Sequence, residues 1–220
     1  MSRVSVRMVA MILAVLAGTA ACRAGSGAAV PAPVADEVKA TAKGKETAVV
    51  AGGCFWGIQA VFQHVKGVIS ATSGYSGGSV KNPDYETVSS GRTGHAESVQ
   101  IVYDPSKVSY GELLRVFFSV ALDPTEVNRQ GPDEGTQYRS VIFYGNDEQK
   151  RIAEAYIAQL DQAKVFRGKI ATQVVALQAF YPAEDYHQNY AALHPYDFYI
   201  MRNDAPKVAN LKREFPEIYK

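Results

Sequence analysis

The sequence has few cysteines, few histidines and almost no net charge. Its 220 residues include two cysteines and four histidines, and the formal net charge is +1. Two cysteines are too few for a disulfide framework and lack the paired spacing of a structural zinc site. The small charge argues against a nucleic-acid binder that acts through bulk charge, and 47% hydrophobic residues exclude a disordered tail. We therefore expect a globular protein in which each cysteine needs its own explanation.

The first cysteine follows a stretch typical of a secretory leader. Two arginines precede the uncharged residues 8–21, which are too few to span a membrane comfortably, so we predict a signal peptide over residues 1–21. The small residues directly before Cys22 resemble the cleavage box of bacterial lipoproteins, in which the cysteine is lipidated. The alternative is ordinary signal-peptidase cleavage. In both cases we expect export, and with lipidation a membrane-anchored protein that faces the periplasm or the cell exterior and touches the membrane only through its lipid.

Aromatic residues are absent from residues 22–46, which consist largely of Ala, Gly, Ser, Pro and Val. This composition predicts a flexible tether. All aromatic residues lie further along the chain, so we predict that the folded domain covers residues 47–220. Acidic residues slightly outnumber basic ones in this part, which gives no basic surface for nucleic acid or anionic lipid.

Hydrophobic periodicity predicts strands at 47–52, 67–74, 97–104, 140–144 and 172–179, and helices at 55–65, 110–120 and 147–165. Asn146 or Asp147 is the expected N-cap of the last helix. This order indicates an α/β fold of the α+β two-layer type. We expect a mixed sheet with a ferredoxin-like βαββαβ core, helices on one face, an extra helix and strand, and a coiled C-terminal tail. Two long loops, 75–94 and 123–137, are expected to build the functional site.

The second cysteine, Cys54, lies where a predicted strand gives way to a predicted helix, after two glycines and before Phe55-Trp56-Gly57. A thiol in the first turn of a helix lies near free N–H groups and the positive end of the dipole, which favours the thiolate. The glycines allow a sharp turn and leave the sulfur accessible. The alternative is a buried apolar cysteine, but the glycines remove the packing neighbours that it would need. We therefore predict that Cys54 is a nucleophile.

Several short motifs follow in a fixed order, with connecting segments such as Asn82-Pro83-Asp84-Tyr85-Glu86. They are Gly53-Cys54-Phe55-Trp56-Gly57, Gly94-His95-Ala96-Glu97, Gly135-Thr136-Gln137-Tyr138-Arg139-Ser140 and Asp185-Tyr186-His187-Gln188-Asn189-Tyr190. Together they resemble the A-type peptide methionine sulfoxide reductases over residues 47–192. The resemblance implies reduction of methionine S-sulfoxide to methionine, in oxidised proteins and as the free amino acid.

Sulfoxide chemistry needs an acid, because a thiolate attacks the sulfur only when the oxygen is protonated or strongly hydrogen-bonded. The resemblance implies that Glu97 is this acid and that the hydroxyls of Tyr85 and Tyr138 donate to the same oxygen. Glu97 then needs a raised pKa, which burial beside aromatic rings would give. From spacing alone, Glu97 could equally be a solvated carboxylate at the end of a strand.

The resemblance also implies a binding pocket. Phe55 and Trp56 would form the walls that accept the methyl group of the substrate, and Asp133 would organise the loop beside the site. His187 and Tyr190 match positions that line the pocket. No metal and no cofactor is implied.

The last step of the reaction is the reduction of oxidised Cys54, and no cysteine follows Cys54 in the sequence to take part in it. Attack on a sulfoxide would leave Cys54 as a sulfenic acid. Many family members then use a second cysteine near the C-terminus to form a disulfide that thioredoxin opens. Cys22 cannot replace it if it is lipidated or removed. We therefore expect a monomer whose sulfenic acid is reduced directly by a thioredoxin-like protein or a small thiol.

Two other functions compete with this interpretation. One is a thiol hydrolase or acyltransferase, in which Cys54 is the nucleophile and His95 or His187 is the base. The other is a non-catalytic surface lipoprotein that binds Met-rich proteins.

Overall fold

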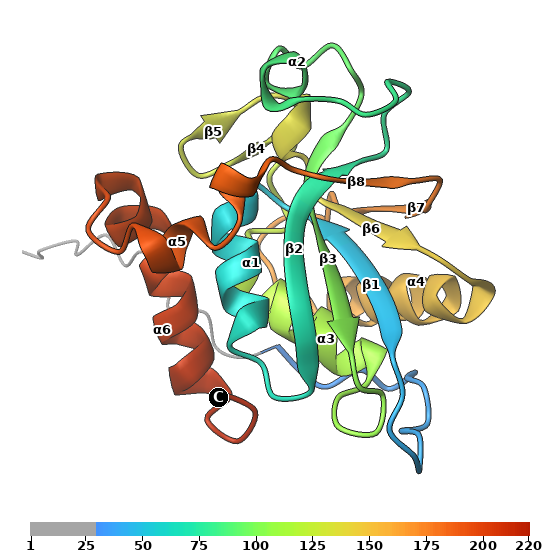
Figure 1. The fold of residues 1–220 in the computed structure, drawn as a ribbon. Coiled ribbons are helices and arrows are strands. Elements are labelled where there is room, and N and C mark those ends of the chain that lie inside the picture. The colour runs from blue at the N-terminus through green and yellow to red at the C-terminus, as the bar shows by residue number, and fades with distance from the viewer. Residues whose placement is uncertain (1–29) are drawn as a thin grey trace, which may run out of the picture.

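The computed structural model describes residues 30–220, and a six-stranded sheet forms its centre (Figure 1). The strands are β1 (Glu46–Ala51), β2 (Val68–Ser76), β3 (Ala96–Tyr103), β4 (Arg129–Gln130), β5 (Asp133–Glu134), β6 (Val141–Tyr144), β7 (Gln173–Ala176) and β8 (Phe180–Pro182). The helices are α1 (Phe55–Gln63), α2 (Tyr85–Ser89), α3 (Tyr110–Val116), α4 (Asp147–Gln162), α5 (Tyr190–Leu193) and α6 (Ala205–Glu214). Within this described part, none of the helices has the length and apolar character needed to cross a membrane. The predicted signal peptide and Cys22 lie outside it.

The sheet is mixed, as the sequence predicts, and its order is β7-β6-β1-β3-β2-β8. Its four central strands, β6-β1-β3-β2, are antiparallel to their neighbours, and this is the strand order of a βαββαβ unit. β7 runs parallel to β6, while β4 and β5 form a separate small ribbon. Val50 lies opposite Val99 on one side and Ile142 on the other, so a row of apolar side chains crosses the centre of the sheet.

Side chains of β1 point alternately to two buried faces. Ala48 and Val50 belong to the main core, which α1, α3 and α4 cover. Val49 and Ala51 belong to a smaller cluster on the opposite face, where the side chain of Phe180 packs on them. Both faces of the central strand are therefore buried, and the strand predicted at 47–52 is confirmed.

The C-terminal region departs from the predicted coil. It contains α5, a π-helical turn (Ile200–Asp204) and the ten-residue helix α6, which packs beside α1 in Figure 1. Pro206 occupies the first turn of α6, where its missing N–H costs nothing, so the Asp-Ala-Pro sequence that begins at Asp204 is a helix start. The π-helical turn and α6 together place Asp204 and Lys207 beside the candidate active site, next to α1.

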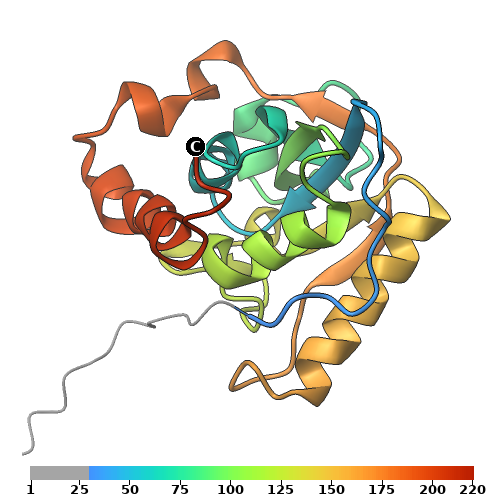
Figure 2. The same ribbon diagram turned by 90° about the horizontal axis from the view of Figure 1, so that it is seen from below.

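The described part of the predicted tether, residues 30–46, is packed along the domain (Figure 2). Val30 is 2% exposed and joins the main core. The carboxylate of Asp36 accepts a hydrogen bond from the Gly111 N–H at 2.8 Å, and that of Glu37 accepts one from the Tyr110 N–H at 2.7 Å. These N–H groups belong to the first turn of α3 and have no partner within the helix. We call residues 30–40 the strap, because they bind α3 and α4 rather than standing free.

Candidate active site

Cys54 occupies a tight turn between β1 and α1. Gly53 has φ +94°, and a Cβ at this position would lie 2.6 Å from Cβ of Gln130. Only glycine meets both requirements without strain. The turn leaves Cys54 in the N-cap position of α1, where its side chain makes no capping hydrogen bond.

The environment of Cys54 differs from the sequence prediction. The residue is only 8% exposed, and its pKa is raised well above the ordinary value, first by burial and then by the negative charges of Glu97 and Asp204. A hydrogen bond from the Trp56 N–H lowers the pKa, as expected at a helix N-terminus, but this effect is smaller. The expectation of an accessible sulfur is therefore wrong, and burial outweighs the effect of the helix N-terminus that favours the thiolate.

Glu97 lies next to this turn, on β3. Its side chain is 2% exposed, and one carboxylate oxygen accepts a hydrogen bond from the Phe55 N–H at 3.0 Å. Burial raises the pKa of Glu97 to about 8, although the hydrogen bond from Phe55 acts in the opposite direction. The prediction of a buried carboxyl with a raised pKa is confirmed, and the alternative of a solvated carboxylate is wrong. At neutral pH this group can donate a proton.

Two tyrosine hydroxyls share this environment. Burial, together with the negative charge of Glu97, raises the pKa of both Tyr85 and Tyr138. Both therefore remain protonated donors across the physiological range. Tyr85 begins α2 and is fixed by its backbone N–H, which donates to the Glu184 carboxylate at 2.8 Å. The long loop 75–94 thus delivers one hydroxyl, and the loop 123–137 leads into the other.

Aromatic rings form the wall beside Cys54. Trp56 stacks on Tyr190 with a centroid distance of 3.8 Å and an interplanar angle of 11°, and its indole N–H donates to Nδ1 of His187 at 3.2 Å. The ring of Phe55 lies 5.0 Å from that of His187. The predicted binding residues thus come together from α1, α5 and the turn before α5.

The hydrogen bond from Trp56 fixes the tautomer of the His187 ring. Because Nδ1 accepts the indole N–H of Trp56, the neutral ring carries its hydrogen on Nε2. Burial lowers the pKa of His187, so the ring is neutral, and Nε2 is buried without a partner. His187 can therefore offer a hydrogen bond to a bound group but is poorly suited to accept a proton at Nδ1.

His95, the other candidate base, has a structural role. Nδ1 accepts the Gly78 N–H at 3.1 Å, and Nε2 lies 2.7 Å from the carbonyl oxygen of Val80. Both ring nitrogens are thus used in holding the loop after β2. Neither is available to activate Cys54.

Asp133 interacts with Tyr199, a residue that the sequence motifs do not assign to the site. The hydroxyl of Tyr199 donates to the Asp133 carboxylate, and the Tyr199 ring meets Trp56 edge-on at 6.0 Å. Burial raises the pKa of Asp133. Tyr199, Asp204 and Lys207 all belong to the supposed coil, and the helix start at Asp204 is the one signal in the sequence that could have indicated them.

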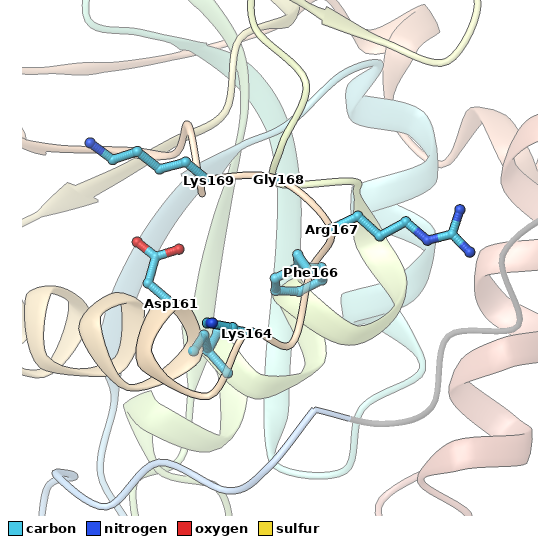
Figure 3. Close-up of a pocket in the computed structure, with 7 residues that line it drawn as sticks. Asp161, Lys164, Phe166, Arg167, Gly168 and Lys169 are labelled. Atoms are coloured by element: carbon cyan, nitrogen blue, oxygen red, sulfur yellow. The ribbon is translucent and has the colours of Figure 1, made fainter.

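A hollow of about 480 Å³ lies elsewhere, at the end of α4 (Figure 3). Lys164, Arg167 and Lys169 line it together with Asp161, but the side chains of Arg167 and Lys169 point away from each other. It contains no nucleophile and no convergent cation cluster. Among residues 30–220, no group of three or more His, Cys, Asp and Glu side chains is placed to bind a metal ion.

Comparison with known proteins gives a consistent result. The model of a family described as peptide methionine sulfoxide reductase matches residues 46–218. A relative with this name in Mesorhizobium japonicum is 62% identical over 178 residues, which cover 81% of this chain and 91% of the relative. Another in Synechocystis sp. is 52% identical over 190 residues, covering 86% and 89%. The solved structure of methionine sulfoxide reductase A from Corynebacterium diphtheriae is 36% identical, has a TM-score of 0.61, and covers 78% of this chain and 86% of that one.

Proposed function

The chain belongs to the peptide methionine sulfoxide reductase family and is a peptide-methionine (S)-S-oxide reductase, and from this we propose how its residues divide the reaction. Sγ of Cys54 attacks the sulfoxide sulfur of the substrate. An S–S bond forms as the protonated oxygen leaves as water. A water molecule then attacks Sγ and the S–S bond breaks, so Cys54 becomes a sulfenic acid and the thioether of methionine is released. In this reaction the sulfoxide gains the two electrons that the thiol loses.

Glu97 supplies the acid in this proposal. With a pKa of about 8, about nine-tenths of the Glu97 carboxyl is protonated at neutral pH. A hydrogen bond or proton from this group makes the sulfoxide oxygen a better leaving group and the sulfur more electrophilic. Tyr85 and Tyr138 add hydroxyl donors to the same oxygen in a site largely closed to water. The buried Glu97 beside Cys54 is the single observation that carries the mechanism.

Substrate selectivity comes from the aromatic wall. Phe55 and Trp56 accept the methyl group, and Tyr190 holds the indole plane by stacking on it. We assign to His187 a supporting role, in which Nε2–H binds a polar group of the substrate while Nδ1 fixes Trp56. Asp133 orients the loop through its hydrogen bond with Tyr199.

Regeneration requires a reductant from outside this chain. The sequence has no cysteine after Cys54, so no disulfide can form with a later residue. We propose that a thioredoxin-like protein or a small thiol attacks the sulfenic acid, releases water and leaves a mixed disulfide, which a second thiol then opens. Repair of oxidised exported proteins is the expected biological role.

Steady-state turnover tests the reaction class. With dithiothreitol as reductant, the reduced protein should convert the S epimer of methionine sulfoxide and leave the R epimer untouched, and Cys54→Ser should abolish conversion. Turnover of both epimers, or turnover that survives Cys54→Ser, would contradict the proposal. No turnover by a folded, reduced protein would instead support a non-catalytic binding role.

Acyl transfer is the remaining rival, and the geometry around the histidines argues against it. His95 is bonded at both ring nitrogens, and Nδ1 of His187 accepts from Trp56. A covalent acyl adduct on Cys54 after incubation with activated esters and thioesters, faster than in Cys54→Ser, would favour this rival.

Export and lipid anchoring are further parts of the proposal. Cys22 lies outside the described residues, and the packed strap begins at Val30, so lipidation would hold the domain close to the membrane surface. If Cys22 is lipidated, the protein should be recovered with the membrane fraction, and Cys22→Ala should release it. Unchanged recovery in the soluble fraction for both proteins would instead indicate simple secretion.

A further inference from the structure

The regeneration step sets a steric and electrostatic requirement at Cys54. An external thiol must reach Sγ of a residue that is only 8% exposed, and it reacts as the thiolate. This inference rests on the proposed one-cysteine cycle and concerns how the structure admits the second reactant.

A small hollow of about 90 Å³ lies beside Gln130, Asp133, Tyr199 and Lys207. Gln130 forms one wall of this hollow and packs against Gly53, the residue before Cys54. The lining of the hollow includes the charged side chains of Asp133 and Lys207, which the aromatic wall lacks.

Two carboxylates, one fully buried and one half-buried, make this region unfavourable for a thiolate. Asp204 is fully buried, and its Oδ2 has no hydrogen-bond partner. It lies against the first turn of α1, where a Cβ on Gly57 would overlap its carboxylate. Asp133 is the second carboxylate, and together these charges would repel both an incoming thiolate and a thiolate at Cys54.

Lys207 counteracts both carboxylates. Its Nζ lies 3.1 Å from Oδ1 of Asp204, and its side chain is 18% exposed. Burial raises the pKa of Asp204, of Asp133 and of Cys54, and the positive charge of Lys207 opposes each of these increases. One ammonium group on α6 therefore acts on the nucleophile and on both neighbouring carboxylates.

We propose that Lys207 is a positioning residue for regeneration, whose ammonium group counters the charges of Asp133 and Asp204 and so allows an external thiolate to reach Cys54. In that step the thiolate sulfur bonds to Sγ of the sulfenic acid, and the hydroxyl group leaves as water after taking up a proton. A second thiol then releases the reduced Cys54 and forms a disulfide with the first.

The charge of the reductant provides the test. Enzyme oxidised with one equivalent of methionine sulfoxide is mixed with 2-mercaptoethanesulfonate, 2-mercaptoethanol or cysteamine, and the loss of sulfenic acid is followed by trapping and mass spectrometry. We expect Lys207→Met to lower the ratio of the rate constants for the anionic and the neutral thiol about tenfold or more, since the positive charge that pairs with Asp204 is removed. Lys207→Arg should keep the ratio of the wild type.

Charge discrimination separates this role from a structural one. If Lys207 only holds α6 in place, Lys207→Met will slow all three thiols by the same factor, and the ratio will not change; that result would overturn the proposal. Asp204→Asn provides a second test, should Lys207→Met fail to fold. This variant retains the cation and removes a neighbouring negative charge, so the ratio should rise, and an unchanged or lower ratio would also overturn it.

Failure of the underlying cycle has a different signature. If wild-type Cys54 gains no oxygen atom on treatment with methionine sulfoxide, the proposed function fails before regeneration is reached. If Cys54 is oxidised normally and only the charge discrimination is missing, the function stands and the role of Lys207 is wrong.

Discussion

Replacing Glu97 with glutamine removes the acid but little of the structure around it. The amide oxygen can still accept the Phe55 N–H, which lies 3.0 Å from the carboxylate in the wild type. Burial makes the acidic form abundant: at neutral pH a carboxyl with pKa 4.5 is protonated in less than about one molecule in a hundred, whereas one with pKa about 8 is protonated in about nine of ten. We expect Glu97→Gln to slow the chemical step by about a hundredfold to ten-thousandfold.

A second effect of the same substitution acts in the opposite direction. The negative charge of Glu97 raises the pKa of Cys54, so its removal should lower that pKa. The variant should therefore react with iodoacetamide at a lower pH than the wild type, while it reduces the sulfoxide more slowly. The two measurements are rapid-quench single turnovers with methionine S-sulfoxide and alkylation of Cys54 across the pH range.

A matched control is available on the far side of the molecule. Glu37 is also a partly buried carboxyl that accepts a hydrogen bond from the first turn of a helix, at the Tyr110 N–H. Glu37→Gln should leave both measurements unchanged. A near-normal single-turnover rate in Glu97→Gln would show that Glu97 is not the acid, and parallel changes in alkylation and reduction would show that it acts only through Cys54.

Three further predictions concern stability and selectivity. Because the folded state raises the pKa of Glu97 from 4.5 to about 8, it keeps a proton that the unfolded chain releases, and the free energy of unfolding falls as pH rises between these values. Urea denaturation should therefore show Glu97→Gln gaining about 3 kcal/mol relative to wild type between about pH 4.5 and about pH 7, and a pH-independent difference would contradict the shift. Trp56→Ala should lower the preference for methionine over ethionine sulfoxide in kcat/KM about tenfold, since one wall of the methyl pocket is lost; an unchanged preference would remove Trp56 from that wall. Asp36→Ala should reduce the free energy of unfolding by about 1 kcal/mol through loss of the hydrogen bond to the Gly111 N–H, with unaltered single-turnover rates, and no loss of stability would show that the strap contributes little.

Local patterns in the sequence predict the parts of the fold that depend on neighbouring residues. The alternation of Val99, Ile101 and Tyr103 predicts β3, and of the two expected N-caps of α4 the structure has Asn146, whose side chain accepts the Gln149 N–H. Two segments are not predicted by local patterns of this kind. The strap is held by Val30 and Asp36 against residues far along the chain. Helix α6 is largely polar and buries only Leu211 completely, so it offers few apolar residues that would mark it in the sequence.

In the site, too, local motifs are predicted from the sequence, whereas contacts between distant residues are not. The motifs identify Cys54 and Glu97, and the family resemblance supplies the aromatic and hydroxyl partners that the structure brings together. A rule based on position in a helix predicts a thiolate at Cys54, yet burial and carboxylates from distant positions outweigh it. Lys207 and Asp204 could not be assigned to the site because only the packing of α6 on α1 brings them there.

The chemistry of Cys54 can be tested directly by one stoichiometric experiment. Fully reduced protein is mixed with one equivalent of methionine S-sulfoxide without any reductant, and intact mass, peptide mapping and released methionine are measured together. We expect one methionine for each protein molecule, a gain of one oxygen atom located on Cys54, and its removal by dithiothreitol. Methionine formed without oxidation of Cys54, or no methionine from folded and reduced protein, would contradict the proposed reaction.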